Sequence, residues 1–261
     1  MTYCKYLIFF VCVLSASYNA KAQQNYQSLC DSCYLLLEKK DITTFEKVVP
    51  KLFDAFAKEN DPYYMISEEL ENKHQEDQSI RLLYMDSQKN RGISDKLTKT
   101  LQQLMKQIDG KNAAYAKSVL LKYGWLTTDE VSEKANEALF LIIQHCEDTE
   151  VQALCLSLLK DKLQDYPNER WHYAFLVDRF AMNQNREQTY GTQKIIKKGV
   201  PYPIPLQCPE KVDSLRKEMG LGSLWKELND EFDCDWSLEK YLLKEKEVKD
   251  IFQNYIQKHS K

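Results

Sequence analysis

The stretch Ala135-Asn-Glu-Ala-Leu-Phe-Leu-Ile-Ile-Gln-His145 decides the fold of this chain. Its middle part, from Ala138 to Ile143, consists of apolar side chains only. Such a run predicts a helix that is buried on all sides, because a surface helix would interrupt it with polar residues. A central helix needs other helices around it. The sequence therefore predicts an all-α fold.

The composition of the whole chain favours the same fold class. Its 261 residues include only 7 glycines and 7 prolines, whereas 29% of them are charged. This balance is typical of helical proteins and excludes collagen-like and low-complexity chains. The formal net charge of -3 gives no support for nucleic-acid binding, which requires a basic surface. The mean hydropathy of -0.56 excludes a polytopic membrane protein.

Residues 1–22 have the features of a secretory signal peptide. Lys5 precedes an apolar run, and Ala20-Lys-Ala22 matches the small-x-small pattern of a cleavage site. The apolar run is shorter than the roughly 20 residues that a helix needs to cross a bilayer. We therefore expect export to the periplasm or the outside, with no stable membrane span after cleavage.

The remaining chain predicts an irregular multi-helix bundle preceded by a helix pair. Helical spacing over 29–39 and 44–59 assigns residues 23–60 to that pair, and the Asp61-Pro62 step separates it from a main helical domain over 61–261. Asp109-Gly-Lys-Asn112 predicts a turn between two helices. The glycines and prolines between 191 and 209 predict one polar loop.

Two pairs of polar residues stand where the helical pattern predicts burial or a helix end. Asp77 and Arg81 are four residues apart, so they share a helix face and can form an ion pair. Gln144 and His145 end the apolar helix, where the helix dipole stabilises a positive charge. An ordinary surface ion pair and a structural histidine are the alternative interpretations.

A third polar pair, Asp178-Arg179, interrupts an apolar helical stretch. Burying a charge costs several kcal/mol unless the charge is paired, so these two residues need partners elsewhere. The downstream segment with Tyr190, Thr192 and Gln193 offers hydroxyl and amide groups, and the glycine within it permits a tight fold over a pocket. The alternative is that the pair only ties this segment to its helix.

Other motifs with known chemistry are missing from the sequence. The chain contains no Gly-x-Ser-x-Gly, no His-Glu-x-x-His and no phosphate-binding loop. Cys30-x-x-Cys33 has no second ligand pair at zinc spacing and no preceding strand, so we expect neither a metal site nor a redox motif nor a cofactor. Six cysteines follow residue 22, an even number that permits disulfides without defining their pairing.

Taken in order, the polar positions resemble an uncharacterised bacterial family described as a domain of unknown function. The motifs that carry the resemblance are Asp77-Gln-x-x-Arg81, Gly124-Trp125, Gln144-His145, Asp178-Arg179 and Tyr190-Gly-Thr-Gln193. The resemblance covers roughly residues 68–221, and Arg216 belongs to its closing segment. This chain has Leu126 where the family usually has proline, and Cys146-Glu147 where it usually has Ala-Asp. The resemblance implies a shared set of polar positions and no known reaction.

Three functions remain open at this point. In the first, the protein is a hydrolase or transferase, His145 is the general acid or base, and Asp77 or Asp178 orients the imidazole. A polar or anionic substrate would then be bound by six other side chains, those of Arg81, Gln144, Arg179, Tyr190, Thr192 and Gln193. In the second, it is a non-catalytic module that binds a small molecule, peptide or glycan. In the third, the polar residues form a purely structural network. The sequence does not decide whether the protein is an enzyme.

Overall fold

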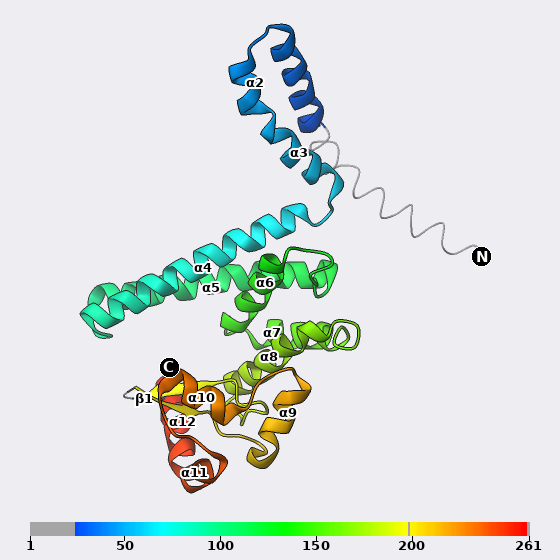
Figure 1. Cartoon of the computed structure of the whole chain (residues 1–261). Coiled ribbons are helices and arrows are strands. Elements are labelled where there is room, and N and C mark those ends of the chain that lie inside the picture. Colours follow the sequence, from blue (N-terminus) through cyan, green and yellow to red (C-terminus); the bar gives the residue numbers. More distant parts are fainter. Residues whose placement is uncertain (1–23, 198, 260–261) are drawn as a thin grey trace, which may run out of the picture. The chain divides into compact units, whose positions relative to one another are not determined.

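The computed structural model describes residues 24–197 and 199–259. The signal peptide predicted over residues 1–22 lies outside this part of the chain. The described residues divide into two compact units, of which the first ends at Glu69 and the second begins at Leu70. Helices dominate both units (Figure 1). The prediction of an all-α multi-helix fold is confirmed.

The first unit is built from short helices. Residues 24–38 are helical, and α2 (Ile42–Val48) and α3 (Pro50–Asn60) follow. The predicted helix over 44–59 is thus broken at Pro50, because proline has no N–H to continue the helical hydrogen bonds. Apolar side chains stay at the surface of this unit, where Phe53 is 78% exposed and Tyr34 is 65% exposed.

Five helices carry the part of the second unit that holds the candidate site. They are α4 (Tyr64–Arg91), of which residues from Leu70 onward belong to this unit, α5 (Lys96–Tyr123), α6 (Glu133–His145), α7 (Thr149–Lys160) and α8 (Arg170–Asn183). The helices α4 and α5 run antiparallel. Near their connection Ser87 Oγ lies 2.7 Å from Thr98 Oγ1, and further along Lys73 lies over the ring of Tyr115.

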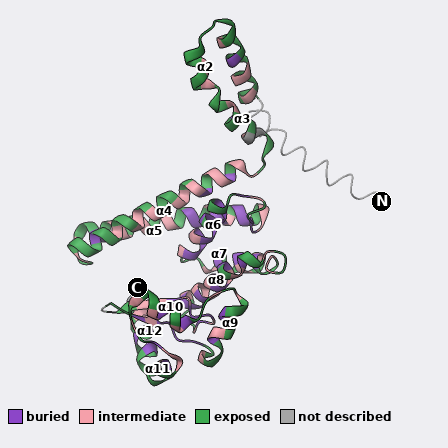
Figure 2. Ribbon diagram, in the orientation of Figure 1, coloured by how far each residue is buried: buried purple, intermediate pink, exposed green. Residues whose placement is uncertain are grey.

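Helix α6 occupies the core, as its apolar sequence predicts. It packs against α5, α7 and α8, and it is largely buried whereas much of α4 is exposed (Figure 2). Ser132 caps its N-terminus by accepting a hydrogen bond of 3.0 Å from the Ala135 N–H. The helix ends at His145, which places that imidazole at the edge of the core rather than inside it.

The turn predicted at Asp109-Gly-Lys-Asn112 does not form, because α5 continues through it. Apolar spacing explains the difference: Leu101, Leu104 and Ile108 on one side are followed by Ala116 and Val119 on the other at continuous helical intervals. Burial of the residues after the glycine, Ala113, Ala116, Val119 and Leu120, in the part of α5 that packs against α6 and α7 outweighs the cost of about 1 kcal/mol for a glycine inside a helix. Asp109 is thereby held on a rigid helix.

The proline- and glycine-rich passage is more regular than the predicted loop. It contains an antiparallel pair of short strands, β1 (Lys194–Lys197) and β2 (Val200–Pro203), in which Lys194 pairs with Pro203. Both prolines of β2 are tolerated because each strand of a two-stranded sheet has a free edge that needs no N–H donor. The segment before β1 remains a loop, and it is the part that matters for the polar residues.

The C-terminal part of the second unit packs four helices around this hairpin. They are α9 (Val212–Glu218), α10 (Leu224–Phe232), α11 (Leu238–Leu243) and α12 (Glu245–His259). A short 3-10 turn over Pro209–Lys211 leads into α9. Their shared core consists of Leu206, Val212, Leu224, Leu228, Trp236, Tyr241 and Val248.

The loop before β1 comes close to this core at Gly191, which has a φ of +71°. A Cβ at this position would lie 2.6 Å from Leu224 Cδ2. Gly191→Ala is therefore expected to lower the free energy of unfolding by about 1–3 kcal/mol, through left-handed backbone strain together with the clash. Chemical denaturation measures this loss.

Substitutions at two other glycines separate the two causes of that loss, the backbone strain and the clash with Leu224. Gly220 has a φ of +74°, but a Cβ placed there would have nothing within 4 Å, and Gly110 lies inside α5 with equally open space. Gly220→Ala should show the strain alone, and Gly110→Ala should stabilise the protein by up to about 1 kcal/mol. Equal losses at Gly191 and Gly220 would contradict the role assigned to the contact with Leu224.

Candidate functional site

Four charged or titratable side chains from three helices meet at one place, which we call the charged quartet. Asp77 and Arg81 come from α4, Asp109 from α5, and His145 from the end of α6. His145 Nδ1 lies 3.0 Å from Asp77 Oδ2, and Arg81 Nη2 lies 3.1 Å from Asp77 Oδ1 and 2.7 Å from Asp109 Oδ1. Asp77 is almost fully buried, whereas about a fifth of the His145 side chain is exposed.

The two nitrogens of His145 have different surroundings. Nδ1 contacts the Asp77 carboxylate, and it is also 3.1 Å from the Nε of Arg81. It donates to Asp77 when it carries the proton and accepts from Arg81 when it does not, because one ring nitrogen cannot do both. No hydrogen bond within residues 24–197 and 199–259 involves Nε2. This nitrogen is therefore available as a proton donor or acceptor.

The two carboxyl groups of the quartet differ in acidity. Burial raises the pKa of Asp77, but the hydrogen bond from His145 and the charges of His145 and Arg81 outweigh it, so the pKa lies below its usual value. Burial raises the pKa of Asp109, and the neighbouring Asp77 adds to this effect despite Arg81. Environments that separate two carboxyl pKa values in this way are a common feature of acid–base sites. Asp77 is the member that stays ionised.

A pocket of about 310 Å³ adjoins the quartet at Asp109. Its wall includes the apolar side chains of Ala113 and Val151 and the charged side chains of Lys106 and Lys117. Cys146 also lines it, but burial raises the pKa of this thiol to about 11. A thiolate is the nucleophilic form of cysteine, so Cys146 is not a nucleophile near neutral pH.

Three buried polar atoms around the quartet have no hydrogen-bond partner among the described residues. They are Asn112 Nδ2, Gln144 Oε1 and Arg179 Nε. Asn112 lies one helical turn after Asp109, and Gln144 is next to His145 in the chain. Buried polar groups in proteins are nearly always hydrogen-bonded. Two more exceptions among the described residues, Trp125 Nε1 and His172 Nε2, lie at the contact between Trp125 and α8.

A second polar network holds the loop before β1, and we call it the loop network. Asp178 on α8 accepts hydrogen bonds from the backbone N–H groups of Thr189 at 2.7 Å, Tyr190 at 3.0 Å and Thr192 at 2.9 Å, and from the Thr192 hydroxyl at 3.0 Å. Burial raises the pKa of Asp178, and these hydrogen bonds offset only part of the rise. Both oxygens of this carboxylate are occupied by the loop.

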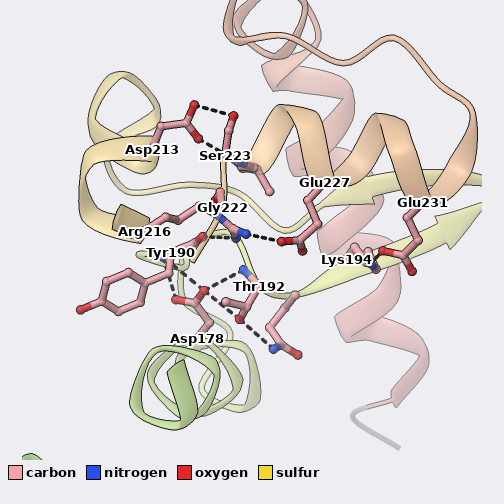
Figure 3. A network of polar contacts seen from close by, with 12 residues as sticks. Asp178, Tyr190, Thr192, Lys194, Asp213, Arg216, Gly222, Ser223, Glu227 and Glu231 are labelled. Atoms are coloured by element: carbon pink, nitrogen blue, oxygen red, sulfur yellow. Dashed lines mark hydrogen bonds and ion pairs between the residues drawn. The ribbon is translucent and has the colours of Figure 1, made fainter. Parts of the chain in front are cut away.

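Arg216 on α9 holds the same loop from the opposite side (Figure 3). It is completely buried, and its guanidinium donates to the Tyr190 carbonyl oxygen at 3.0 Å, to the Gly222 carbonyl oxygen at 2.5 Å and to the Glu227 carboxylate. The Tyr190 ring points away from Asp178 (Figure 3), and burial raises the pKa of its phenol to about 12. Tyr190 therefore stays protonated at neutral pH.

The two remaining loop residues are also tied to their neighbours. Gln193 donates from its side-chain amide to Thr192 Oγ1 at 2.9 Å, and its backbone N–H donates to Gln188 Oε1 at 2.9 Å. Gln188 is fully buried and in turn donates to the carbonyl oxygens of Gln193 and Ile204. These hydrogen bonds link the loop to the start of the hairpin.

The structure thus divides the predicted site residues into two groups. Asp77, Arg81 and His145 meet in the charged quartet, and Gln144 is next to His145 in the chain. Arg179 lies on α8 and makes no hydrogen bond or ion pair with the quartet in the described part of the chain. Asp178, Tyr190, Thr192 and Gln193 meet in the loop network. Asp77, and not Asp178, is the carboxylate in contact with His145.

Sequence reasoning missed Asp109 and Asn112, because the glycine between them indicated a turn. The uninterrupted apolar spacing of α5 was the signal that could have placed both on a helix. Arg216 was named only as part of the family resemblance. Arg216 is surrounded in the sequence by other charged residues of a short helix, a pattern that does not predict complete burial.

A buried group between α6 and α8 was also missed. Glu169 Oε2 lies 2.7 Å from His172 Nδ1, and Asn136 donates to Glu169 Oε1 at 3.0 Å and to the Leu126 carbonyl oxygen at 2.8 Å. Glu169 is completely buried and His172 nearly so, and the ring of Trp125 lies against that of His172. This group fixes the Gly124-Trp125 turn against α8 and has no access to solvent-borne substrate.

The described residues include no group of three or more His, Cys, Asp or Glu side chains that could hold a metal ion. In the same part of the chain, no helix has the length and apolar character needed to span a membrane. The six cysteines within it are free thiols.

Fold and site together define an all-α protein in which a carboxylate, an imidazole and a guanidinium meet where α4, α5 and α6 converge. The chain belongs to the Family of unknown function (DUF6624), which matches residues 65–233. This range contains both the charged quartet and the loop network. No curated protein and no solved structure matches the chain.

Proposed function

We propose that this protein is an exported enzyme of the hydrolase or transferase type, in which His145 is the general acid or base. The single observation that carries the proposal is the asymmetry of His145: Asp77 lies 3.0 Å from Nδ1, while Nε2 has no partner among the described residues. A carboxylate that orients a histidine in this way also stabilises the imidazolium that forms when the ring takes up a proton.

The quartet supplies the steps that such a reaction needs. Nε2 of His145 accepts a proton from water or from an acceptor hydroxyl as its oxygen forms a bond to the electrophilic centre of the substrate. The bond to the leaving group then breaks, and the imidazolium returns the proton to that group. Arg81, which bridges Asp77 and Asp109, is a positioning residue, and Gln144 is a substrate contact. Asp178 has no role in this proposal.

Two further features support the proposal. The pocket of about 310 Å³ beside Asp109 is of the size that small-molecule sites have in enzymes. The signal-like sequence over residues 1–22 supports export, and with it a polar substrate of the periplasm or the outside, such as a small molecule, a peptide or a glycan.

The test is a comparison of turnover by His145→Ala and by a matched control, His74→Ala. His74 lies on α4 one turn before Asp77, outside the quartet. Purified proteins are incubated with chromogenic esters, amides, glycosides and phosphate esters. We expect any turnover to fall about 100-fold or more in His145→Ala and to persist in His74→Ala, with both variants still folded by circular dichroism. Equal turnover in the two variants would contradict the assignment of His145.

A second candidate function is a non-catalytic binding module. The observation in its favour is the exposed apolar surface of the first unit, where Phe53 is 78% exposed and Tyr34 is 65% exposed, since such patches mark interaction sites. Complete lack of turnover by the wild-type protein across the substrate panel would favour this function over the first.

A further inference from the structure

Arg179 is a partly buried cation with no anionic partner among the described residues. Its residue keeps some exposure, but its Nε is buried and makes no hydrogen bond within the described residues. Among those residues, the one hydrogen bond of its guanidinium is a contact of 3.7 Å from Nη1 to the Sδ of Met182, a weak acceptor. In the part of the chain that the structure describes, no carboxylate lies within ion-pair distance of Arg179.

This arrangement is unfavourable in the absence of a ligand. A buried charge costs several kcal/mol unless it is paired, and arginine does not avoid that cost by losing its proton at physiological pH. Burial lowers the pKa of Arg179; the phenol of Tyr255 opposes this shift in part, and the positive charge of Arg81 adds to it.

Contacts between α6 and α8 place Arg179 level with the catalytic end of α6. The rings of Phe140 and His172 lie 4.4 Å apart, and Asn183 Nδ2 lies 3.4 Å from the Cys146 carbonyl oxygen. Arg179 stands between His172 and Asn183 on α8, as His145 stands between Phe140 and Cys146 on α6. These contacts put Arg179 on the face of α8 that packs against α6, the helix whose Gln144 Oε1 also lacks a partner among the described residues.

Arg81 itself is not free to bind a ligand, because Asp77 and Asp109 already occupy its guanidinium. Arg179, in contrast, has no carboxylate partner among the described residues, so an external anion can neutralise it. A carboxylate or a phosphate matches the planar fork of a guanidinium, and the hydroxyl or amine of the same molecule would satisfy Gln144. An oxyanion that also carries a hydrogen-bond donor would therefore satisfy both unpaired groups of the protein, Arg179 Nε and Gln144 Oε1.

We infer that Arg179 binds an oxyanion group of the substrate, either a carboxylate or a phosphate, next to His145. This inference rests on the proposed function and names the substrate class of the same site. The reacting bond of such a substrate would lie within reach of His145 Nε2, with its anionic group on Arg179.

The experiment measures thermal unfolding of the full protein with inorganic phosphate or acetate, against sodium chloride at the same ionic strength. Wild type should gain several degrees in one of the two oxyanions, because a ligand that binds only the folded state stabilises it. A gain with phosphate assigns a phosphoryl substrate, and a gain with acetate assigns a carboxylate substrate. Equal unfolding temperatures in phosphate, acetate and chloride would overturn the inference.

Variants separate a binding role from a structural one. Arg179→Met should unfold at a higher temperature than wild type in chloride, because the unpaired charge is gone, and should lose the response to the oxyanion. Arg91→Met, which removes an exposed arginine of α4, should keep the wild-type response. If Arg179→Met unfolds at a lower temperature and still responds to the oxyanion, Arg179 is a structural residue.

His145→Ala distinguishes failure of this inference from failure of the proposed function. It should retain the oxyanion response while losing turnover, because the anion binds Arg179 and not His145. If the wild-type protein responds to the oxyanion but turns over no substrate, the anion-binding role of Arg179 is supported and only the catalytic role of His145 is contradicted.

Discussion

Asp178→Ala is expected to lower the free energy of unfolding by about 3–5 kcal/mol, the largest single loss that the structure predicts. The carboxylate is completely buried and accepts from three backbone N–H groups and one hydroxyl. Alanine leaves all these donors buried without an acceptor, and water cannot replace it without opening the loop. Because burial opposes ionisation of Asp178, the loss of unfolding free energy is smaller than the summed free energies of its four hydrogen bonds.

Urea denaturation followed by circular dichroism measures this effect. Asp165→Ala is the matched control, because Asp165 is exposed and its loss should change stability by less than about 0.5 kcal/mol. Asp178→Asn should recover part of the stability, since one amide oxygen still accepts from the loop. A loss below about 1 kcal/mol for Asp178→Ala would mean that solvent reaches these donors and that the loop network does not hold the loop.

Arg216→Met is expected to lower the free energy of unfolding by about 3–4 kcal/mol. Methionine has a similar length, but it leaves two buried carbonyl oxygens, those of Tyr190 and Gly222, without donors. It also leaves the Glu227 carboxylate without its partner. Glu227 is 41% exposed on its side chain, so water compensates that group in part, and most of the loss comes from the two carbonyl oxygens.

The neighbouring Lys217→Met serves as the control, because Lys217 is exposed on the same helix. Arg216→Lys should rescue little, since an ammonium group cannot reach three acceptors in the directions that a guanidinium does. The double variant Asp178→Ala/Arg216→Met should lose less than the sum of the single losses, because both residues hold the same loop at Tyr190. Strict additivity would show that the two residues act on separate structures.

Much of the helical framework could be predicted from local patterns. The apolar run of α6 is buried as expected. The errors occur where a local signal competes with packing. Glycine and asparagine at 110 and 112 indicate a turn, but burial of the helix from Asn112 to Leu120 keeps α5 intact. The prolines after β1 indicated a loop, although an isolated strand pair accommodates them.

The candidate site was predictable only in part, for a related reason. Charged residues at helical spacing within buried stretches had to find partners, and this argument identified Asp77, Arg81 and His145. The same reasoning does not identify which residues, far away in the sequence, are the partners of these charges. Asp178 was an equally good partner for His145 on the sequence alone, and in the structure its carboxylate is taken up by the loop from Thr189 to Thr192.

The sequence by itself determined the helical class, the central helix and the identity of most residues in both polar networks. These properties follow from side-chain chemistry and from periodicity, which are local. Only the tertiary structure decided that the polar residues form two networks rather than one, that Asp109 completes the first, and that Arg179 has no anionic partner among the described residues. Pairing of charges depends on distances between helices far apart in the chain, and no local pattern encodes those distances.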